Sequence, residues 1–243
     1  MSGAHGHRGI ELVAAGDSPV HRLDPRGKTI GLIGLVLVAV TTPPGAWPAY
    51  AAYAAVLAAL VLLARLPLRH VALRMTVEVP FLLAAALLPF TVEDGVTLGA
   101  TVAAKATIGV LAMVLLSSTT PFPRLLAGFE RLRVPPLLTA IIGVMWRYLH
   151  VLGEDVRRMR IAREARGYQG RWLWQAGAVA AGLAALFIRS LERGERVHLA
   201  MVSRGFRGTM PATVTAPLSL GAGDVVFLAA LAVAAVAIRT VLA

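Results

Sequence analysis

Apolar residues along the chain are gathered into long blocks separated by short polar or charged stretches. The first of these blocks, Thr29–Thr42, is short for a membrane span. The side chain of Lys28, just before it, could extend its charged end toward water. A transmembrane helix needs about 20 mostly apolar residues. The pattern therefore predicts an all-α integral membrane protein with about five transmembrane helices. The blocks are Thr29–Thr42, Gly45–Ala64, Val77–Val92, Val96–Ser117 and Asp224–Val241.

The same pattern divides the chain into four parts. Residues 1–28 are polar and contain no apolar core of a cleaved signal peptide. Residues 29–121 hold the first four expected spans, and residues 216–243 hold the last one. Between them, residues 122–215 are basic and interrupted, and we expect this region to lie in the cytoplasm with its helices at the membrane surface.

Composition supports a membrane protein with strongly basic segments outside the bilayer. The chain is 57% hydrophobic, and its 24 Lys and Arg residues against 13 Asp and Glu give a net charge of +11. Such a charge is common in nucleic-acid-binding proteins. Soluble domains, however, average roughly 45–50% apolar residues, so this chain is too apolar to be a soluble DNA-binding domain. The absence of cysteine excludes disulfides and cysteine-based metal sites.

The basic residues also predict the orientation of the spans. Arg and Lys side chains precede the first block and follow the second, whereas the loops after the first and third blocks carry none. Positive loops remain cytoplasmic, so the N-terminus is expected inside and the C-terminus outside.

Two further apolar stretches, Pro135–Leu152 and Trp172–Ile188, are ambiguous. Each is apolar enough to cross the bilayer, but crossing would place the six arginines between them outside, against the charge rule. We therefore expect two helical arms that do not cross, and a pair of crossing helices is the alternative. The arginines are Arg157, Arg158, Arg160, Arg163, Arg166 and Arg171.

An internal repeat with an offset of 38 residues lies in this basic region. The tripeptide Ala165-Arg166-Gly167 recurs as Ser203-Arg204-Gly205, and an aromatic residue follows each copy. Upstream, Glu154 aligns with Glu192 and Arg158 with Arg196. Each copy is typical of a helix that ends at a glycine in the left-handed conformation. The Glu and Arg of each copy are also spaced to form a weak ion pair within the helix.

The two Arg-Gly ends have two interpretations. An arginine in the last turn can simply complement the helix dipole. Two matched ends instead favour a partner with two matched sockets, where each arginine binds carboxylates and the neighbouring apolar residues fill a groove. Those apolar neighbours are Ile161, Leu199 and Met201.

Other chemistry is sparse. No phosphate-binding loop, zinc-protease motif or nucleophile elbow is present, so we expect neither catalytic residues nor a cofactor. Lys105 lies near the middle of the fourth span, and it could form an ion pair with Glu78 or contact another subunit. His5 and His7 could bind a transition metal weakly, but two histidines on a tail are usually unspecific, and we predict no metal site.

These features together resemble the T component of energy-coupling-factor transporters, and within that family the cobalt-transport member CbiQ. The resemblance to the family rests on the segment Leu23-Asp24-Pro25-Arg26-Gly27-Lys28, on the stretch from Phe122 to Pro135 and on the two Arg-Gly motifs. The closer resemblance to CbiQ rests on Val77–Phe81, Leu88–Phe90 and Arg147–Leu152. It implies a subunit of a bacterial cytoplasmic membrane that couples two ATP-binding cassette ATPases to a metal-binding S component. Residues 122–215 would be the coupling domain. Nickel or vitamin transport, and a basic scaffold that binds anionic lipid, are the alternatives.

Overall fold

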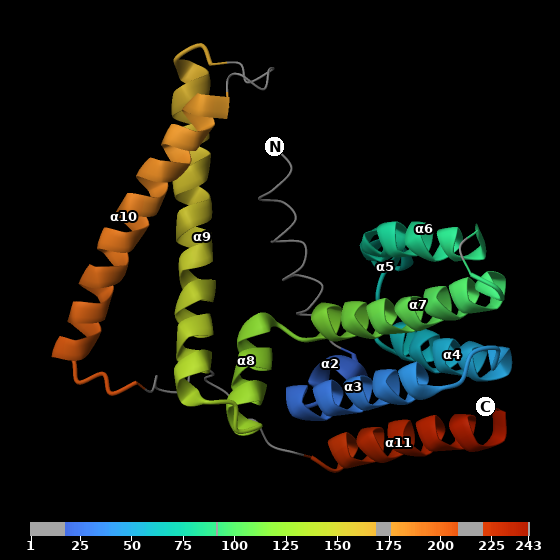
Figure 1. The fold of residues 1–243 in the computed structure, drawn as a ribbon. Helices are drawn as coiled ribbons and strands as arrows, with labels where there is room; N and C mark the ends of the chain where they lie inside the picture. The colour runs from blue at the N-terminus through green and yellow to red at the C-terminus, as the bar shows by residue number, and fades with distance from the viewer. Residues whose placement is uncertain (1–17, 91, 169–175, 209–220, 243) are drawn as a thin grey trace. The chain divides into compact units, whose positions relative to one another are not determined.

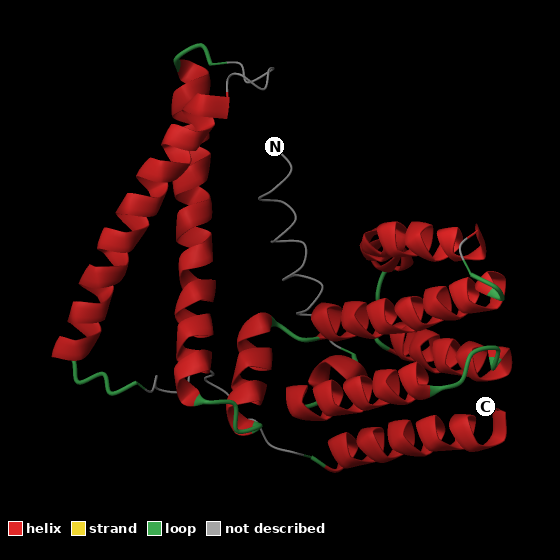
Figure 2. Cartoon of the chain, in the orientation of Figure 1, coloured by secondary structure: helices red, strands yellow, loops and turns green. Residues whose placement is uncertain are grey.

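The computed structural model describes residues 18–90, 92–168, 176–208 and 221–242, and all regular secondary structure within these ranges is helical (Figures 1 and 2). The chain divides into two compact units. We call residues 1–132 with 214–243 the bundle unit, and residues 133–213 the arm unit. The helices are α2 (Pro19–Arg22), α3 (Pro25–Thr41), α4 (Trp47–Leu63), α5 (Leu68–Met75), α6 (Val79–Leu87), α7 (Gly95–Thr119), α8 (Phe122–Arg131), α9 (Pro136–Ala165), α10 (Ala176–Ser203) and α11 (Ala222–Leu242), with short 3-10 turns at Thr76–Glu78 and Leu88–Phe90.

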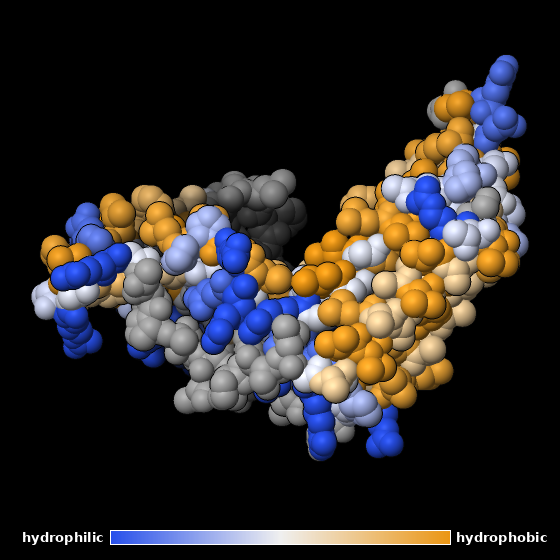
Figure 3. Space-filling view, turned by 90° about the horizontal axis from the view of Figure 1, so that it is seen from below, coloured by the Kyte–Doolittle hydropathy of each residue, from blue (hydrophilic) through white to orange (hydrophobic). Residues whose placement is uncertain are grey.

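The bundle unit is built around α3, α4, α7 and α11, which pack side by side (Figure 1). Helix α3 contacts α7 and α11, and α4 also contacts both of them. The core of the bundle unit contains the fully buried side chains of Tyr53, Leu57, Leu35, Ile108 and Leu115. Outside this core, many large apolar side chains are exposed, and Figure 3 shows them over one face of the unit. A surface so apolar is typical of contact with lipid.

Helix α3 begins at Pro25, four residues before the apolar block predicted from the sequence. The reason is local, because the side chain of Asp24 accepts a hydrogen bond from the backbone N–H of Arg26, and Pro25 fits the first helical position. Lys28 is consequently inside the helix and only 1% exposed. Its ammonium donates to the carbonyl of Thr119 at 3.0 Å. The expectation that Lys28 extends toward water was therefore wrong.

The third predicted span is longer and less regular than the apolar block. Helical structure begins at Leu68 and continues through α5, a 3-10 turn and α6 to a second turn that ends at Phe90. Pro80 lies at the start of α6 and Pro89 in the closing turn, where missing N–H donors are tolerated. The basic residues Arg69 and Arg74, expected in a loop, lie on α5.

Four helical stretches among the described residues are long and apolar enough to cross a membrane: Leu68–Phe90, Gly95–Thr119, Pro136–Ala165 and Ala222–Leu242. Three of them match predicted spans. The third stretch is α9, which charge had assigned to a non-crossing arm, whereas length and composition alone admit it as a span. Helices α3 and α4 have 17 residues each, fewer than the roughly 20 of a typical span.

The arm unit consists of α9, with 30 residues, and α10, with 28 residues. The two helices run antiparallel and diverge along their length (Figure 1). Helix α9 is continuous from the apolar stretch after Pro135 to the first Arg-Gly motif, so the predicted arm and the predicted repeat belong to one helix. The arm unit therefore carries both motifs, one at the C-terminal end of each helix.

Candidate functional site

The first Arg-Gly end closes α9 with a Schellman motif. Gly167 has a φ of +78°, and its N–H donates to the carbonyl of Glu164 at 3.0 Å. The next N–H, that of Tyr168, donates to the carbonyl of Arg163 at 3.1 Å. These two bonds satisfy carbonyls that the helix end would leave free. Only glycine adopts this backbone conformation without strain, so the sequence prediction of a left-handed cap is confirmed here.

The second end has the same geometry, which confirms the prediction for the second copy. Gly205 has a φ of +82° and donates to the carbonyl of Val202 at 2.9 Å, while Phe206 donates to the carbonyl of Met201 at 3.0 Å. The repeat is therefore structural as well as sequential. Its departure from the first copy, serine instead of alanine at Ser203, leaves the cap intact because the hydroxyl bonds to Ala200 within the helix.

Arg166 and Arg204 occupy the cap position of their helices and are exposed. Within the described parts of the chain, neither guanidinium has an ion-pair or hydrogen-bond partner. Ile161 and Leu199, five residues before the arginine in each copy, are 50% and 67% exposed. Each helix end thus presents an available guanidinium and, farther back on the same helix, an exposed apolar side chain, and a guanidinium of this kind suits a partner groove that contains carboxylates.

The two ends differ in the side chains next to the cap. In the first copy, the guanidinium of Arg163 lies over the ring of Tyr168, 5.8 Å from its centroid. In the second copy, the equivalent residues are Met201 and Phe206. The first end therefore carries an Arg-Glu pair, Arg163 and Glu164, where the second carries the apolar Met201 and Val202, although both ends have the same backbone.

Upstream of the caps, both predicted pairs within the helices are present as weak contacts. Arg158 lies 3.5 Å from Glu154, and Arg196 lies 4.0 Å from Glu192. Glu154 is bound more closely by Arg157, at 2.8 Å. Both side chains of each pair are largely exposed, so each pair contributes only about 0.2–0.5 kcal/mol to helix stability.

Sequence reasoning missed a contact between the two arms. Arg193 of α10 donates to the carboxylate of Asp155 of α9 at 3.0 Å. The repeat aligns these two residues at the offset of 38, but it does not by itself indicate a contact, because that depends on how the helices pack.

Lys105 and Glu78, predicted as an intramembrane pair or subunit contact, have different partners. Lys105 donates to the carbonyl of Val40 at 2.7 Å, near the C-terminal end of α3, and lies 6.0 Å from the centroid of the Tyr50 ring. A cation is favourable at such a helix end. Glu78 is 2% exposed and accepts a hydrogen bond from the hydroxyl of Thr107 at 2.5 Å. No ion pair joins the two residues in the described structure.

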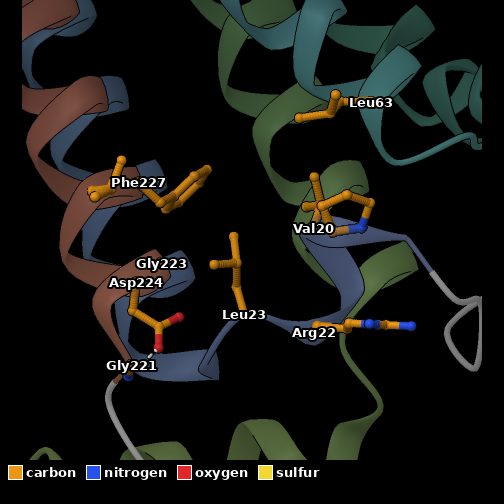
Figure 4. Close-up of a pocket in the computed structure, with 10 residues that line it drawn as sticks. Val20, Arg22, Leu23, Leu63, Gly221, Gly223, Asp224 and Phe227 are labelled. Carbon is orange, nitrogen blue, oxygen red and sulfur yellow. Dashed lines mark hydrogen bonds between the residues drawn. The ribbon is translucent and has the colours of Figure 1, made fainter.

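A pocket of about 520 Å³ lies between α2, the end of α4 and the start of α11 (Figure 4). Its lining is mostly apolar, with Val20, Leu63 and Phe227 among the residues around it. Asp224 at its edge accepts N–H groups from Asp24 at 2.7 Å and from Gly221 at 2.8 Å, so both carboxylate oxygens are engaged in holding the helix starts together. The pocket is remote in sequence from the Arg-Gly motifs and has no arrangement of groups suited to catalysis.

The described residues contain no group of three or more His, Asp or Glu side chains that could hold a metal ion. His5 and His7, considered as weak metal ligands, lie outside the described residues. The remaining candidate site is therefore the pair of Arg-Gly ends.

Comparison with known proteins gives this site a context. The family described as "CbiQ: Cobalt transport protein" matches residues 16–215, a range that includes both motifs. A cobalt transport protein CbiQ of Rhodobacter capsulatus is 34% identical over 201 residues, covering 77% of this chain and 80% of that protein. An energy-coupling factor transporter transmembrane protein EcfT of Bacillus selenitireducens is 31% identical over 242 residues, covering 88% and 89%. An uncharacterised protein of Methanocaldococcus jannaschii is 33% identical over 116 residues, which cover 48% of this chain and only 43% of that protein.

Proposed function

Because the chain belongs to the CbiQ family of cobalt transport proteins, we propose that it couples ATP hydrolysis by partner subunits to cobalt uptake. Its relatives include transmembrane T components of energy-coupling-factor transporters. Such components are non-catalytic, in agreement with the prediction that the chain is not an enzyme. The cobalt assignment follows the family description and the CbiQ relative.

The observation that carries this proposal is the pair of structurally equivalent Arg-Gly ends. Each is a rigid helix terminus fixed by two cap hydrogen bonds, and each presents an exposed arginine. A partner with two matched sockets suits such a pair. We propose that two ATP-binding cassette ATPases bind them through Arg166 and Arg204, with Ala165, Gly167, Ser203 and Gly205 setting the backbone of the contact.

The proposed orientation places both ends in the cytoplasm, where ATP is available. The N-terminus would be cytoplasmic and the C-terminus outside, because the basic loops then all face inward. Helix α9 satisfies the length and composition of a span, but its second half carries five arginines from Arg157 to Arg166, including the cap residue. We therefore place α9 and α10 at the inner face of the membrane rather than across it.

In this mechanism, ATP binding brings the ATPases together and moves the two helix ends. Helices α9 and α10 transmit that motion because a hydrogen-bonded helix resists bending, and at 1.5 Å per residue they extend roughly 40–45 Å. The bundle unit would pass the motion to a membrane S component that binds the metal. Lys105 and Glu78 are bonded within this chain, so we assign them a structural role in the bundle.

The test is co-expression of the chain with the ATPase and S-component genes that neighbour its own. Stoichiometric co-purification of an ATPase, followed by ATP-dependent Co²⁺ uptake into reconstituted vesicles, is the expected result. Uptake of Ni²⁺ or of a vitamin in preference to Co²⁺ would refute the substrate assignment alone. A chain that binds anionic lipid but no ATPase would refute the coupling function and favour the lipid-scaffold alternative.

A further inference from the structure

Helices α9 and α10 meet along a narrow stripe of half-buried residues. On α9 the stripe contains Leu152, Asp155, Met159 and Arg163, at helical spacing. On α10, Gly182 lies against this stripe, since a Cβ placed there would be 3.4 Å from Met159 and 3.8 Å from Arg163. The contact runs from this point to the Asp155–Arg193 pair.

This contact has little apolar packing to fix it. Thr139 and Ala140, near the start of α9, are the buried residues of that helix, and no described side chain of α10 is fully buried. The Asp155–Arg193 ion pair is also the one side-chain hydrogen bond recorded between the two helices in the described structure. The relative setting of the arms therefore depends heavily on this polar contact.

The two residues of the pair occupy the same position in the two copies of the repeat. Asp155 and Arg193 are equivalent residues at the offset of 38, so each is the same distance along its helix from its own motif arginine. Arg166 lies 11 residues after Asp155 (166 − 155), and Arg204 lies 11 residues after Arg193 (204 − 193). At 1.5 Å per residue, both ends are about 16 Å from the shared contact, and they extend from it in opposite directions because the helices are antiparallel (Figure 1).

We propose that Asp155 and Arg193 are positioning residues that hold α9 and α10 at a fixed register. Both Arg-Gly ends then lie at equal distances from one shared contact. The proposal rests on the coupling function proposed above. A displacement of one end by an ATPase then changes the crossing angle of the helices and displaces the other end by an equal amount. Without the pair, each helix keeps its own hydrogen bonds and its cap, but the two ends can move independently.

The side chains of the pair are 31% and 34% exposed, and partly exposed ion pairs have modest energies. We therefore expect Asp155→Asn and Arg193→Gln to fold and to retain both helices. Their effect should be on the relation between the arms. Another equivalent pair with opposite charges, Arg157 and Glu195, is not joined across the helices, and Glu195→Gln is therefore a matched control.

The chain has no cysteine, so spin labels can be attached at chosen positions in the full-length protein. Ala162→Cys and Ala200→Cys place labels at equivalent, exposed positions, each seven residues beyond the pair (162 − 155 and 200 − 193). We expect one narrow distance distribution in the parent and in Glu195→Gln, and a clearly broader one in Asp155→Asn and in Arg193→Gln. The charge swap, Asp155→Arg with Arg193→Asp, should restore a narrow distance distribution. Unchanged distributions in both single variants would overturn the proposal.

A second readout separates positioning from simple stability. In the assembled complex, Asp155→Asn should leave ATPase binding intact and lower the transport per ATP hydrolysed by about twofold to fivefold, the range for a partly exposed ion pair. Partial recovery in the charge swap is expected, whereas an equal loss in Glu195→Gln would contradict a specific role. If no ATPase binds the parent protein, the coupling function fails, but the label distances still decide whether the pair sets the arms.

Discussion

Replacing Gly167 by alanine should weaken the first docking end without changing its charge. The residue has a φ of +78°, and a Cβ built there has no other atom within 4 Å. The cost is therefore backbone strain alone, about 1–2 kcal/mol for a non-glycine residue in this conformation. A change of that size raises the open fraction of the last turn about 5- to 30-fold.

Hydrogen–deuterium exchange of the amides of residues 167 and 168 measures this opening, because both are bonded to α9 carbonyls in the cap. Gly153→Ala is the matched control in the same helix. It lies in the interior of α9 with open space around it and no positive φ, so alanine should stabilise the helix by about 0.5–1 kcal/mol. Exchange in Gly167→Ala that is no faster than in the parent, or equally faster in both variants, would refute the reasoning.

Three further substitutions test the bundle unit by thermal unfolding in detergent. Gly99→Ala would place its Cβ 2.6 Å from a backbone carbonyl oxygen and should destabilise by about 1–3 kcal/mol. Gly109→Ala, in open space on the same helix, should stabilise by about 0.5–1 kcal/mol, and similar losses in both variants would contradict the packing. Asp224→Asn should cost about 1–3 kcal/mol, because an amide nitrogen would face one of the two N–H groups that the carboxylate now accepts. Thr107→Val should cost a similar amount by removing the hydrogen bond to the buried Glu78, and an unchanged midpoint in either variant would count against that bond.

Features that depend on neighbouring residues in the sequence could be predicted well. The glycine caps at Gly167 and Gly205 were found because a left-handed position strongly favours glycine and because the pattern occurs twice. The apolar blocks likewise indicated helices, and α7 and α11 lie close to their predicted ranges. In both cases the signal is local and independent of tertiary packing.

Features that depend on contacts between distant residues could not be predicted in the same way. Hydropathy suggested that Lys28 reaches water, but the start of α3 at Pro25 brings it against the end of α7. Glu78 was paired with Lys105 on charge alone, whereas its partner is an uncharged hydroxyl. The Asp155–Arg193 contact needs the antiparallel packing of α9 and α10, which a repeat in the sequence does not specify.

The docking role of the two arginines is tested most directly by charge reversal in the assembled transporter. The variant carries Arg166→Glu and Arg204→Glu, and its control carries Arg158→Glu and Arg196→Glu, the same charge change at equivalent positions whose side chains are 71% and 69% exposed. The measurement is ATPase co-purification together with ATP-dependent Co²⁺ uptake in reconstituted vesicles. We predict that the first variant loses both while the control retains them. Normal ATPase binding and coupled uptake in the Arg166→Glu, Arg204→Glu variant would contradict the account.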